Sequence, residues 1–401
     1  MAVPLLERNT WALISTEPSY NDPLTPSPTG ADALLCSQIG FQPLDNETET
    51  AVRVKGSPGA DADVTTCGVA RFTPTVEFRY DEPAGTPPRF GRLMTACGMA
   101  QVISVAPYTG TADAASTAGT LVFPAGAEAG LHYYTGAVGT FIAGTESGRT
   151  FTIVHYNGGT LTATIKAHDG QAISPDGTSE FSINRFVQYR PTSLSFDAPD
   201  SSYRGWHFFD KIKHYALGGR GTMSNEISVK AIPRMSFEMT ALYQQGADAS
   251  TPAPSFLNTT QPQAVNLGNT PVIDVFGIQG LCFESDSLQL GNEMTHQVSP
   301  GCTEFIGLTD RSVTGTITLK MPLLANVDFY EISRLQTQGR IAITHGTASG
   351  RYCTIVRPQC TLQAPQPGAT DTLRTIAMAY KALPTDASTG LLNTDIFYTF
   401  C

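Results

Sequence analysis

Apolar and polar positions alternate over short stretches throughout this chain, and this pattern predicts β-strands. Phe237, Met239 and Ala241 alternate with polar neighbours, and the stretch 376–380 repeats the pattern. Such alternation is expected of a strand that buries one face. Within 151–165, two alternating runs flank an Asn-Gly-Gly sequence, which predicts a β-hairpin. We therefore expect a mainly β fold.

Two distant parts of the chain share a series of short motifs. Leu35-Cys36 and Leu281-Cys282 are each followed, at the same spacing, by a leucine and an Asn-Glu pair, and then by Ser-Pro-Gly. We interpret this similarity as two copies of one module, each running strand, long loop, strand, helix, strand. The motifs are Leu44, Asn46, Glu47 and Ser57–Gly59 in the first copy, and Leu290, Asn292, Glu293 and Ser299–Gly301 in the second.

Each copy contains one short stretch that favours a helix. The first is Pro87–Cys97, with prolines at its start, and the second is Asn326–Gln338, with Asn326 as the expected N-cap. Gly98 and Gly339 follow these stretches, where a helix often ends in a left-handed residue. The prediction is one short helix beside the sheet of each module.

The first copy is longer than the second by about 100 residues, which predicts an inserted domain. We assign 1–106 and 201–245 to the first module, 107–200 to the insert, 246–271 to a Pro-rich linker and 272–401 to the second module. The insert is rich in Thr, Gly and Ala, and its turns and alternating runs predict a small β-sandwich. The alternative is a flexible loop without a core.

Composition narrows the function. The chain has 401 residues, 15% of them charged, and a net charge of −10, which argues against a surface that grips nucleic acid. No secretory signal and no long apolar run is present, so we expect neither export by that route nor a membrane span. The eight cysteines are scattered without a Cys-x-x-Cys pair, and we expect free thiols that mostly fill apolar space.

The chain lacks the common sequence patterns of nucleophilic, metal-dependent and phosphate-binding enzymes, so we expect no catalysis, cofactor or metal. Five weaker groups have both a functional and a structural interpretation, and we favour ordinary packing or turns for each. They are a zinc site at His132, His155 and His168; a metal pair at His207 and His214; calcium ligands at Asp169 and Asp176; disulfides that involve Cys353, Cys360 and Cys401; and single-strand binding by Trp206, Phe208, Phe209, Lys211 and Lys213.

Several segments resemble tail tube proteins of long-tailed bacteriophages. They include Gly218–Thr222, Ala241–Tyr243, Gln289–Glu293, Arg311–Ile317 and Ala96–Gly98. The resemblance implies β-sandwich or barrel modules, each with one flanking helix, whose subunits join sheet edges into rings around a channel. The rings would stack into the tube of the virion tail, after assembly in the host cytoplasm. With two modules per chain, we expect a trimeric ring with pseudo-sixfold symmetry.

The same resemblance implies the partners. These are other copies of the chain, the tape measure, terminator and tail tip proteins, and viral DNA that passes without specific binding. We predict that the loops 45–66 and 291–310 become ordered between stacked rings. The residues assigned to this contact are Asn46, Glu47, Pro58, Asn292, Glu293 and Pro300.

Two other functions stay open on the sequence. The insert resembles, in composition, Thr/Gly-rich β-sandwiches that bind a carbohydrate or a receptor at a host surface. A hydrolase of the cell wall or capsule is the third possibility, because paired carboxylates need no recognisable sequence pattern.

Overall fold

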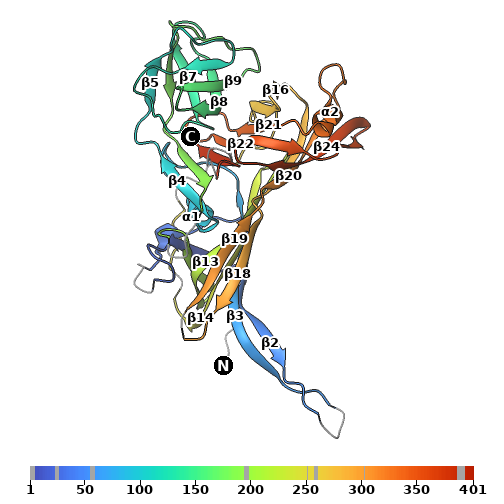
Figure 1. Ribbon diagram of the computed structural model, residues 1–401. Coiled ribbons are helices and arrows are strands. Elements are labelled where there is room, and N and C mark those ends of the chain that lie inside the picture. Colours follow the sequence, from blue (N-terminus) through green and yellow to red (C-terminus); the bar gives the residue numbers. More distant parts are fainter. Residues whose placement is uncertain are drawn as a thin grey trace.

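The structure is a computed structural model that describes residues 5–22, 27–54, 59–193, 198–250, 252–256, 261–301, 303–385 and 393–401. Most of the described chain is β-strand, with two short α-helices among the described residues (Figure 1). The strands form one large network, a separate six-stranded sheet and a two-stranded hairpin. The predicted mainly β fold is confirmed.

The large network contains a row of eight antiparallel strands, which we call the central sheet. Its strands come from both ends of the chain, because the first four lie before residue 250 and the last four after residue 280. In order they are β2 (Gln38–Thr50), β3 (Asp63–Glu77), β14 (Arg234–Asp248), β13 (Ile212–Ser228), β17 (Phe283–Gln289), β20 (Thr314–Lys320), β24 (Leu373–Ala382) and β23 (Gln366–Thr370).

A second layer of strands packs on one face of the central sheet. Its strands pair in the order β4, β11, β25, β22, β21, β15 and β16. In addition, β1 pairs with β12, and β12 pairs with β13 of the central sheet. Their bounds are β4 (Met99–Ile103), β11 (Val187–Pro191), β25 (Phe397–Phe400), β22 (Cys353–Leu362), β21 (Gly339–His345), β15 (Val272–Val275), β16 (Ile278–Gln279), β1 (Thr10–Thr16) and β12 (Tyr203–Phe209).

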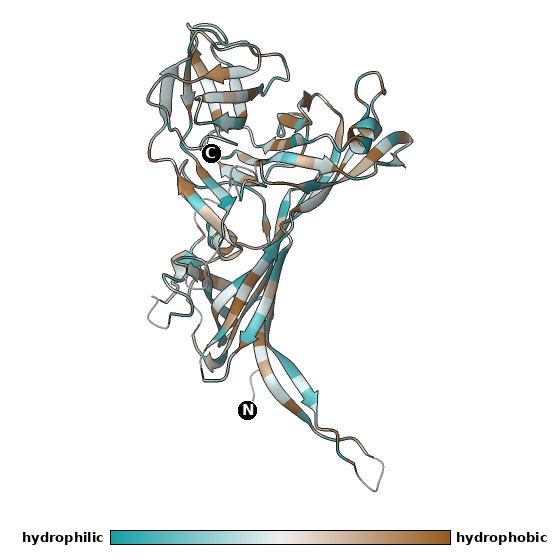
Figure 2. Ribbon diagram, in the orientation of Figure 1, coloured by the Kyte–Doolittle hydropathy of each residue, from teal (hydrophilic) through white to brown (hydrophobic). Residues whose placement is uncertain are grey.

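One continuous apolar core lies between the two layers. Phe72 and Ile317 reach it from the central sheet, and Tyr189 and Ile355 reach it from the second layer, all of them fully or almost fully buried. Because one cluster spans both halves of the chain, burial of apolar surface holds the halves together. Figure 2 shows the resulting alternation of hydrophobic and hydrophilic positions along the strands.

The two helices are shorter than predicted. α1 covers Gly91–Ala96 and α2 covers Phe329–Arg334. Asp328, and not Asn326, caps α2, because its carboxylate accepts hydrogen bonds from the first turn at 3.0 and 3.1 Å. The expected N-cap at Asn326 is therefore wrong by two residues.

The two glycines that follow the helices have different roles. Gly98 has a φ of 77°, as expected of a left-handed residue after α1. After α2, Gln336 takes the left-handed conformation with a φ of 52°, and Gly339 begins β21. The expected role of Gly339 is therefore wrong. A Cβ atom there would lie 2.2 Å from the ring of Phe276, so close packing requires this glycine.

A separate six-stranded sheet, which we call the small sheet, lies between β4 and β11 in sequence. It has its own apolar core, which includes Phe141, Phe151 and Phe181. The predicted hairpin in 151–165 is confirmed, because Ile153 lies opposite Ile165 on neighbouring antiparallel strands. The strand order is β5 (Tyr108–Thr111), β10 (Glu180–Ile183), β7 (Val138–Ala143), β8 (Thr150–Asn157), β9 (Thr162–Ala167) and β6 (Thr120–Val122).

The predicted long loops 45–66 and 291–310 are mostly β-hairpins, so the loop prediction is wrong. β2 and β3 stay paired out to Thr50 opposite Asp63. Residues 291–310 contain β18 (Asn292–Val298) and most of β19 (Glu304–Arg311), which pair with each other. Residues 45–50 and 63–67 of the first hairpin are mostly polar on both faces, so the apolar alternation that identifies a strand is missing there. In Figure 1 the hairpin of β2 and β3 extends away from the body as an arm.

Candidate functional site

Two edges of the central sheet lack a neighbouring strand within the described part of the chain. β2 pairs with β3 alone, and β23 pairs with β24 alone. Gln38 on β2 and Gln366, Ala369 and Thr370 on β23 are exposed. An edge strand presents unpaired N–H and C=O groups, which a further strand can complete.

A continuous junction joins the two halves of the chain at the middle of the central sheet. β13 pairs with β17 over five residue pairs, from Ser224 opposite Gln289 to Ser228 opposite Ser285. The pairing continues at both ends, where Val229 donates its N–H to Glu284 and Leu290 donates its N–H to Met223, each at 2.9 Å. This junction is an antiparallel ladder between strands that are far apart in sequence.

The strands at the open edges occupy positions comparable to those of the junction strands. β13 forms a hairpin with β14, and β23 forms a hairpin with β24. On the other side, β17 pairs with β20 as β2 pairs with β3. The open edge of β23 therefore corresponds to the junction side of β13, and the open edge of β2 corresponds to the junction side of β17.

The face of the central sheet that is turned away from the core carries short polar side chains. Thr75 and Ser236 lie opposite each other, with 3.0 Å between their hydroxyl oxygens. Positions joined by strand pairing form a row across seven strands with one charged member. These positions are Gln38, Thr75, Ser236, Ser224, Gln289, Thr314 and Lys381.

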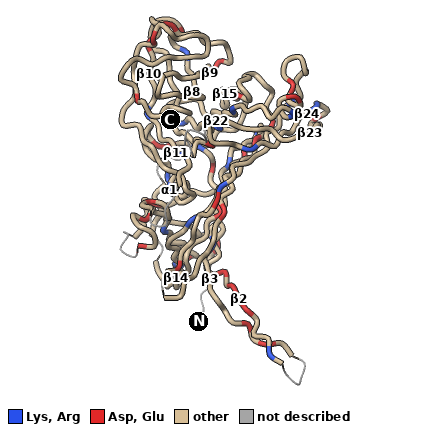
Figure 3. The backbone as a smooth tube through the Cα atoms, in the orientation of Figure 1, with Lys and Arg blue, Asp and Glu red and all other residues tan. Residues whose placement is uncertain are grey.

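A neighbouring row on this face carries charges of both signs. Glu77, Arg234 and Glu226 follow one another across three paired strands, and Ser287, Thr316 and Ala379 continue the row. Figure 3 shows basic and acidic residues interspersed along the backbone, without a large basic patch on the side in view. Such a face offers no cluster of cations for phosphate binding.

The core side of the junction strand β17 carries a charged residue. The carboxylate of Asp286 accepts hydrogen bonds from Arg357, with 2.6 Å between Oδ2 and Nη1, and from the hydroxyl of Tyr380 at 2.9 Å. All three side chains are almost completely buried. The charge of Asp286 raises the pKa of Arg357 although burial acts in the opposite direction. No sequence pattern predicts this network, because its members lie on three strands that only the fold brings together.

The residues predicted to contact a stacked ring have different environments. Asn292 is buried, and its amide nitrogen donates to the carbonyls of Cys97 at 2.7 Å and Gly221 at 2.9 Å. Its role is therefore to join β18 to the body of the protein. Asn46 and Glu47 lie on β2, Glu293 lies on β18, Pro300 lies in the turn between β18 and β19, and Pro58 falls outside the described residues.

Three histidines fall within or beside the small sheet. The rings of His132 and His155 contact edge to face with centroids 5.1 Å apart, whereas His168 hydrogen-bonds to Thr152 at 2.8 Å. Burial lowers the pKa of His132 to about 3 and that of His168 to about 4. Among the described residues, the three histidines do not bring their ring nitrogens together as a group of possible metal ligands.

His207 and His214 lie opposite each other on the paired strands β12 and β13. The ring of His207 stacks on Phe41 with a centroid distance of 3.9 Å. Neither ring nitrogen of His207 has a hydrogen-bond partner among the described residues. Nearby, Lys213 places its ammonium group 4.1 Å from the ring centroid of Trp206, so this lysine packs on the strand pair.

The predicted turns at Asp169 and Asp176 are confirmed. Their carboxylates accept backbone hydrogen bonds from Gln171 at 3.0 Å and from Thr178 at 2.9 Å, which is the usual chemistry of aspartate in turns. Seven cysteines are described and all are free, including Cys353 and Cys360, whereas Cys302 lies outside the described residues.

The sequence comparison agrees with this architecture. The family model for the phage tail tube protein matches residues 106–382, which is more than half of the chain. The chain therefore belongs to the phage tail tube protein family, and it is a structural protein of the bacteriophage tail. No curated protein matches the chain. No helix in the described part of the chain has the length and apolar character needed to cross a membrane.

Proposed function

We propose that this tail tube subunit closes rings by pairing β23 of one copy with β2 of the next. The observation that carries the proposal is the internal junction of β13 and β17, which joins comparable edges within one chain. The open edge of β23 in one subunit would then pair with the open edge of β2 in the next subunit, in the same way as β13 pairs with β17 within one chain.

The internal junction also supplies a register for the contact between subunits. We match Thr75 on β3 with Thr318 on β20, since both side chains point away from the core. Strand pairing then makes Gln38 the counterpart of Ser285, and Thr370 the counterpart of Ser228. Since Ser228 lies opposite Ser285, Thr370 should lie opposite Gln38 of the next copy. The same correspondence places Gly368 opposite Gly40.

Side-chain chemistry is consistent with this register. Thr370 and Gln38 would lie on the polar face of the sheet, as Ser228 and Ser285 do. On the core side, Ala369 would face Ile39 and Pro367 would face Phe41, so apolar surface would be buried. Pro367 lacks an N–H group, which removes one hydrogen bond from the ladder and disfavours unregulated pairing at this edge.

We propose that three subunits close one ring. Each chain contributes eight strands and one internal junction, so three chains would give about 24 strands with internal and intersubunit junctions in alternation. A repeated head-to-tail contact closes into a ring when its rotation permits. Six comparable positions around the channel would give the pseudo-sixfold symmetry expected from the two modules.

The polar face of the central sheet is the face we assign to the channel. Its Ser, Thr and Gln residues are neutral, its charged residues are of both signs, and the net charge of the protein is −10. Phosphates would meet little attraction there, which suits viral DNA that must move through the tube. Viral DNA, the tape measure, terminator and tail tip proteins are the partners proposed for the assembled tube, which we place in the virion tail after assembly in the host cytoplasm.

We further propose that residues 1–106 with 201–245 and residues 272–401 are two copies of one module, with 107–200 inserted in the first. Support comes from the matching hairpins β13–β14 and β23–β24, and from the separate core of the small sheet. The arm of β2 and β3 and the hairpin of β18 and β19, with Asn46, Glu47, Glu293 and Pro300, are proposed to contact the next ring.

Electron microscopy of the purified full chain tests this function. Rings or stacked tubes with threefold symmetry and six similar inner lobes are the expected result. Particles of another symmetry would contradict the proposal that three subunits close one ring. A protein that stays monomeric at every concentration, including those used for tube assembly in the presence of the tail tip complex, would overturn the edge-pairing function itself.

A further inference from the structure

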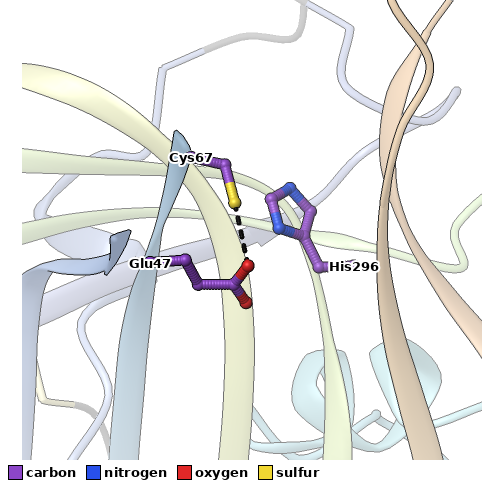
Figure 4. A group of neighbouring side chains, drawn as sticks. All are labelled: Glu47, Cys67 and His296. Carbon is purple, nitrogen blue, oxygen red and sulfur yellow. Dashed lines mark hydrogen bonds between the residues drawn. The ribbon is translucent and has the colours of Figure 1, made fainter. Parts of the chain in front are cut away.

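We propose a binding site for Zn²⁺ or a similar transition metal where β2, β3 and β18 meet. Its ligands are the carboxylate of Glu47, the thiol of Cys67 and the imidazole of His296. One donor atom from each of these residues lies within 4.8 Å of the other two. Figure 4 shows the three side chains pointing toward one another from their separate strands.

The two ligands on the arm are held together by strand pairing. Glu47 on β2 lies opposite Cys67 on β3, and the thiol donates to Oε2 of Glu47 at 3.2 Å. Neighbouring sulfur and oxygen ligands of a tetrahedral zinc ion are about 3.5 Å apart, given the usual bond lengths. The observed separation therefore differs little from the one that the ion requires.

The third ligand is oriented by a second carboxylate. Nε2 of His296 lies 2.9 Å from Oε1 of Glu304, across the β18–β19 hairpin. This contact leaves Nδ1 on the edge of the ring that faces Glu47 and Cys67 in Figure 4. A histidine that binds a metal usually donates its other N–H to a carboxylate, which fixes the tautomer and the ring. Glu304 is thus a positioning residue.

The ligand atoms and their exposure to solvent determine which metal ions can bind. Sulfur and nitrogen donors favour zinc and its transition-metal neighbours over calcium or magnesium, which prefer oxygen. Glu47 is exposed, and Cys67 and His296 are partly exposed, so an ion can enter from solvent and keep a water molecule as its fourth ligand. On binding, the Sγ–metal bond forms and the thiol proton passes to solvent.

A bound ion would join two parts of the protein that share no strand pairing at this point. Glu47 and Cys67 belong to the arm, whereas His296 belongs to the β18–β19 hairpin, a separate two-stranded sheet. Coordination would fix the angle between them. The site needs only the folded subunit, so metal binding can be tested whether or not the proposed rings form.

Titration of the full-length chain with Co²⁺ tests the proposal. We expect one equivalent to bind with a thiolate-to-cobalt charge-transfer band and the visible bands of a tetrahedral ion, and Zn²⁺ to remove both. Cys67→Ser should abolish the charge-transfer band, and His296→Gln and Glu47→Gln should each weaken binding about tenfold or more. Glu304→Gln should weaken it by a smaller factor, with the tetrahedral spectrum retained.

Cys36→Ser and Cys282→Ser are the matched controls, because these thiols lie outside the site, and both should keep the wild-type spectrum and affinity. Calorimetry with Zn²⁺ in two buffers of different ionisation enthalpy should show a released proton in the wild type that Cys67→Ser lacks. A charge-transfer band that survives Cys67→Ser, or an affinity unchanged by His296→Gln in protein with a wild-type circular dichroism spectrum, would overturn the site. Absence of Co²⁺ and Zn²⁺ binding by the folded wild type would do the same.

Discussion

Arg357 and Asp286 form an ion pair with 2.6 Å between Nη1 and Oδ2, and neither side chain has appreciable contact with solvent. Arg357 lies on β22 in the second layer, and Asp286 lies on β17, the strand that joins the two halves of the central sheet. The hydroxyl of Tyr380 completes the network from β24. The junction strand is thus tied to both layers.

Removal of one partner from this pair should destabilise the protein strongly. Asp286→Ala leaves the Arg357 guanidinium buried without its counter-charge, and we expect a loss of about 3–5 kcal/mol in the free energy of unfolding. The double variant Asp286→Ala/Arg357→Met should recover most of the loss, because no charge then stays buried. Urea unfolding of the three proteins measures both effects. Equal stability of the single and double variants would contradict this account.

A proline on the open edge of β23 should block assembly without unfolding the subunit. In the proposed register the N–H of Ala369 points toward the neighbouring subunit, as that of the corresponding Ile227 points toward β17. Ala369→Pro removes this donor and leaves the pairing with β24 intact. We expect monomers by analytical ultracentrifugation, with an unchanged circular dichroism spectrum. Ala369→Ser, which keeps the N–H, should still form rings. Rings formed by the proline variant would contradict pairing between subunits through β23.

Added positive charge on the polar face should make the channel retain DNA. Ser287 lies on this face and is exposed, so Ser287→Arg places one cation per subunit where we assign the channel. We expect assembled tubes of this variant to hold duplex DNA at low salt and to release it as salt rises. The controls are Ser287→Glu and Gln171→Arg, and both should behave like the wild type. Gln171 lies in a turn of the small sheet, away from the face assigned to the channel. Equal retention by Gln171→Arg and Ser287→Arg would show that the face does not line the channel.

Buried histidine should make the protein sensitive to acid. Burial lowers the pKa of His207 to about 3, whereas the unfolded chain has a histidine pKa of about 6.5. The unfolded state therefore takes up this proton first, and stability falls as the pH drops from about 6.5 toward about 3. At pH 5 the loss from this residue should reach about 2 kcal/mol relative to pH 7.

The variant His207→Phe isolates this contribution. It keeps an aromatic ring beside Phe41 and has no proton to gain, so the difference in unfolding free energy between pH 7 and pH 5 should shrink by about 2 kcal/mol. Urea unfolding at the two pH values measures it. If the difference in unfolding free energy between pH 7 and pH 5 is the same in His207→Phe and the wild type, other groups cause the acid sensitivity, among them the paired His214.

Local patterns predicted what depends on neighbours in sequence. The strands around Met239 and Met378 and the hairpin that pairs Ile153 with Ile165 follow from alternation and from turn residues. The arm of β2 and β3 escaped prediction, because it is polar on both faces and strand pairing alone keeps it extended. A single sequence carries no local signal for such a strand.

The sites depend on contacts between distant residues. Cys67 and His296 come together only after β2, β3 and the β18–β19 hairpin are in place, so no spacing of ligands in the sequence identifies them. Asn292 is expected in a long loop between stacked rings, yet its amide is buried against Gly221. Burial of this kind is set by packing rather than by local composition.

Disulfide formation between subunits tests the central claim most directly. In the proposed register the pair of Gln38 and Thr370 corresponds to a non-hydrogen-bonded pair of the internal junction, where side chains are close enough for a disulfide. The variant Gln38→Cys/Thr370→Cys should yield covalent trimers on non-reducing gels after mild oxidation. Each single variant, and Gln38→Cys/Ala369→Cys with one cysteine on the opposite face, should not. Failure of the first pair in assembled rings, or equal cross-linking by the mismatched pair, would contradict the account.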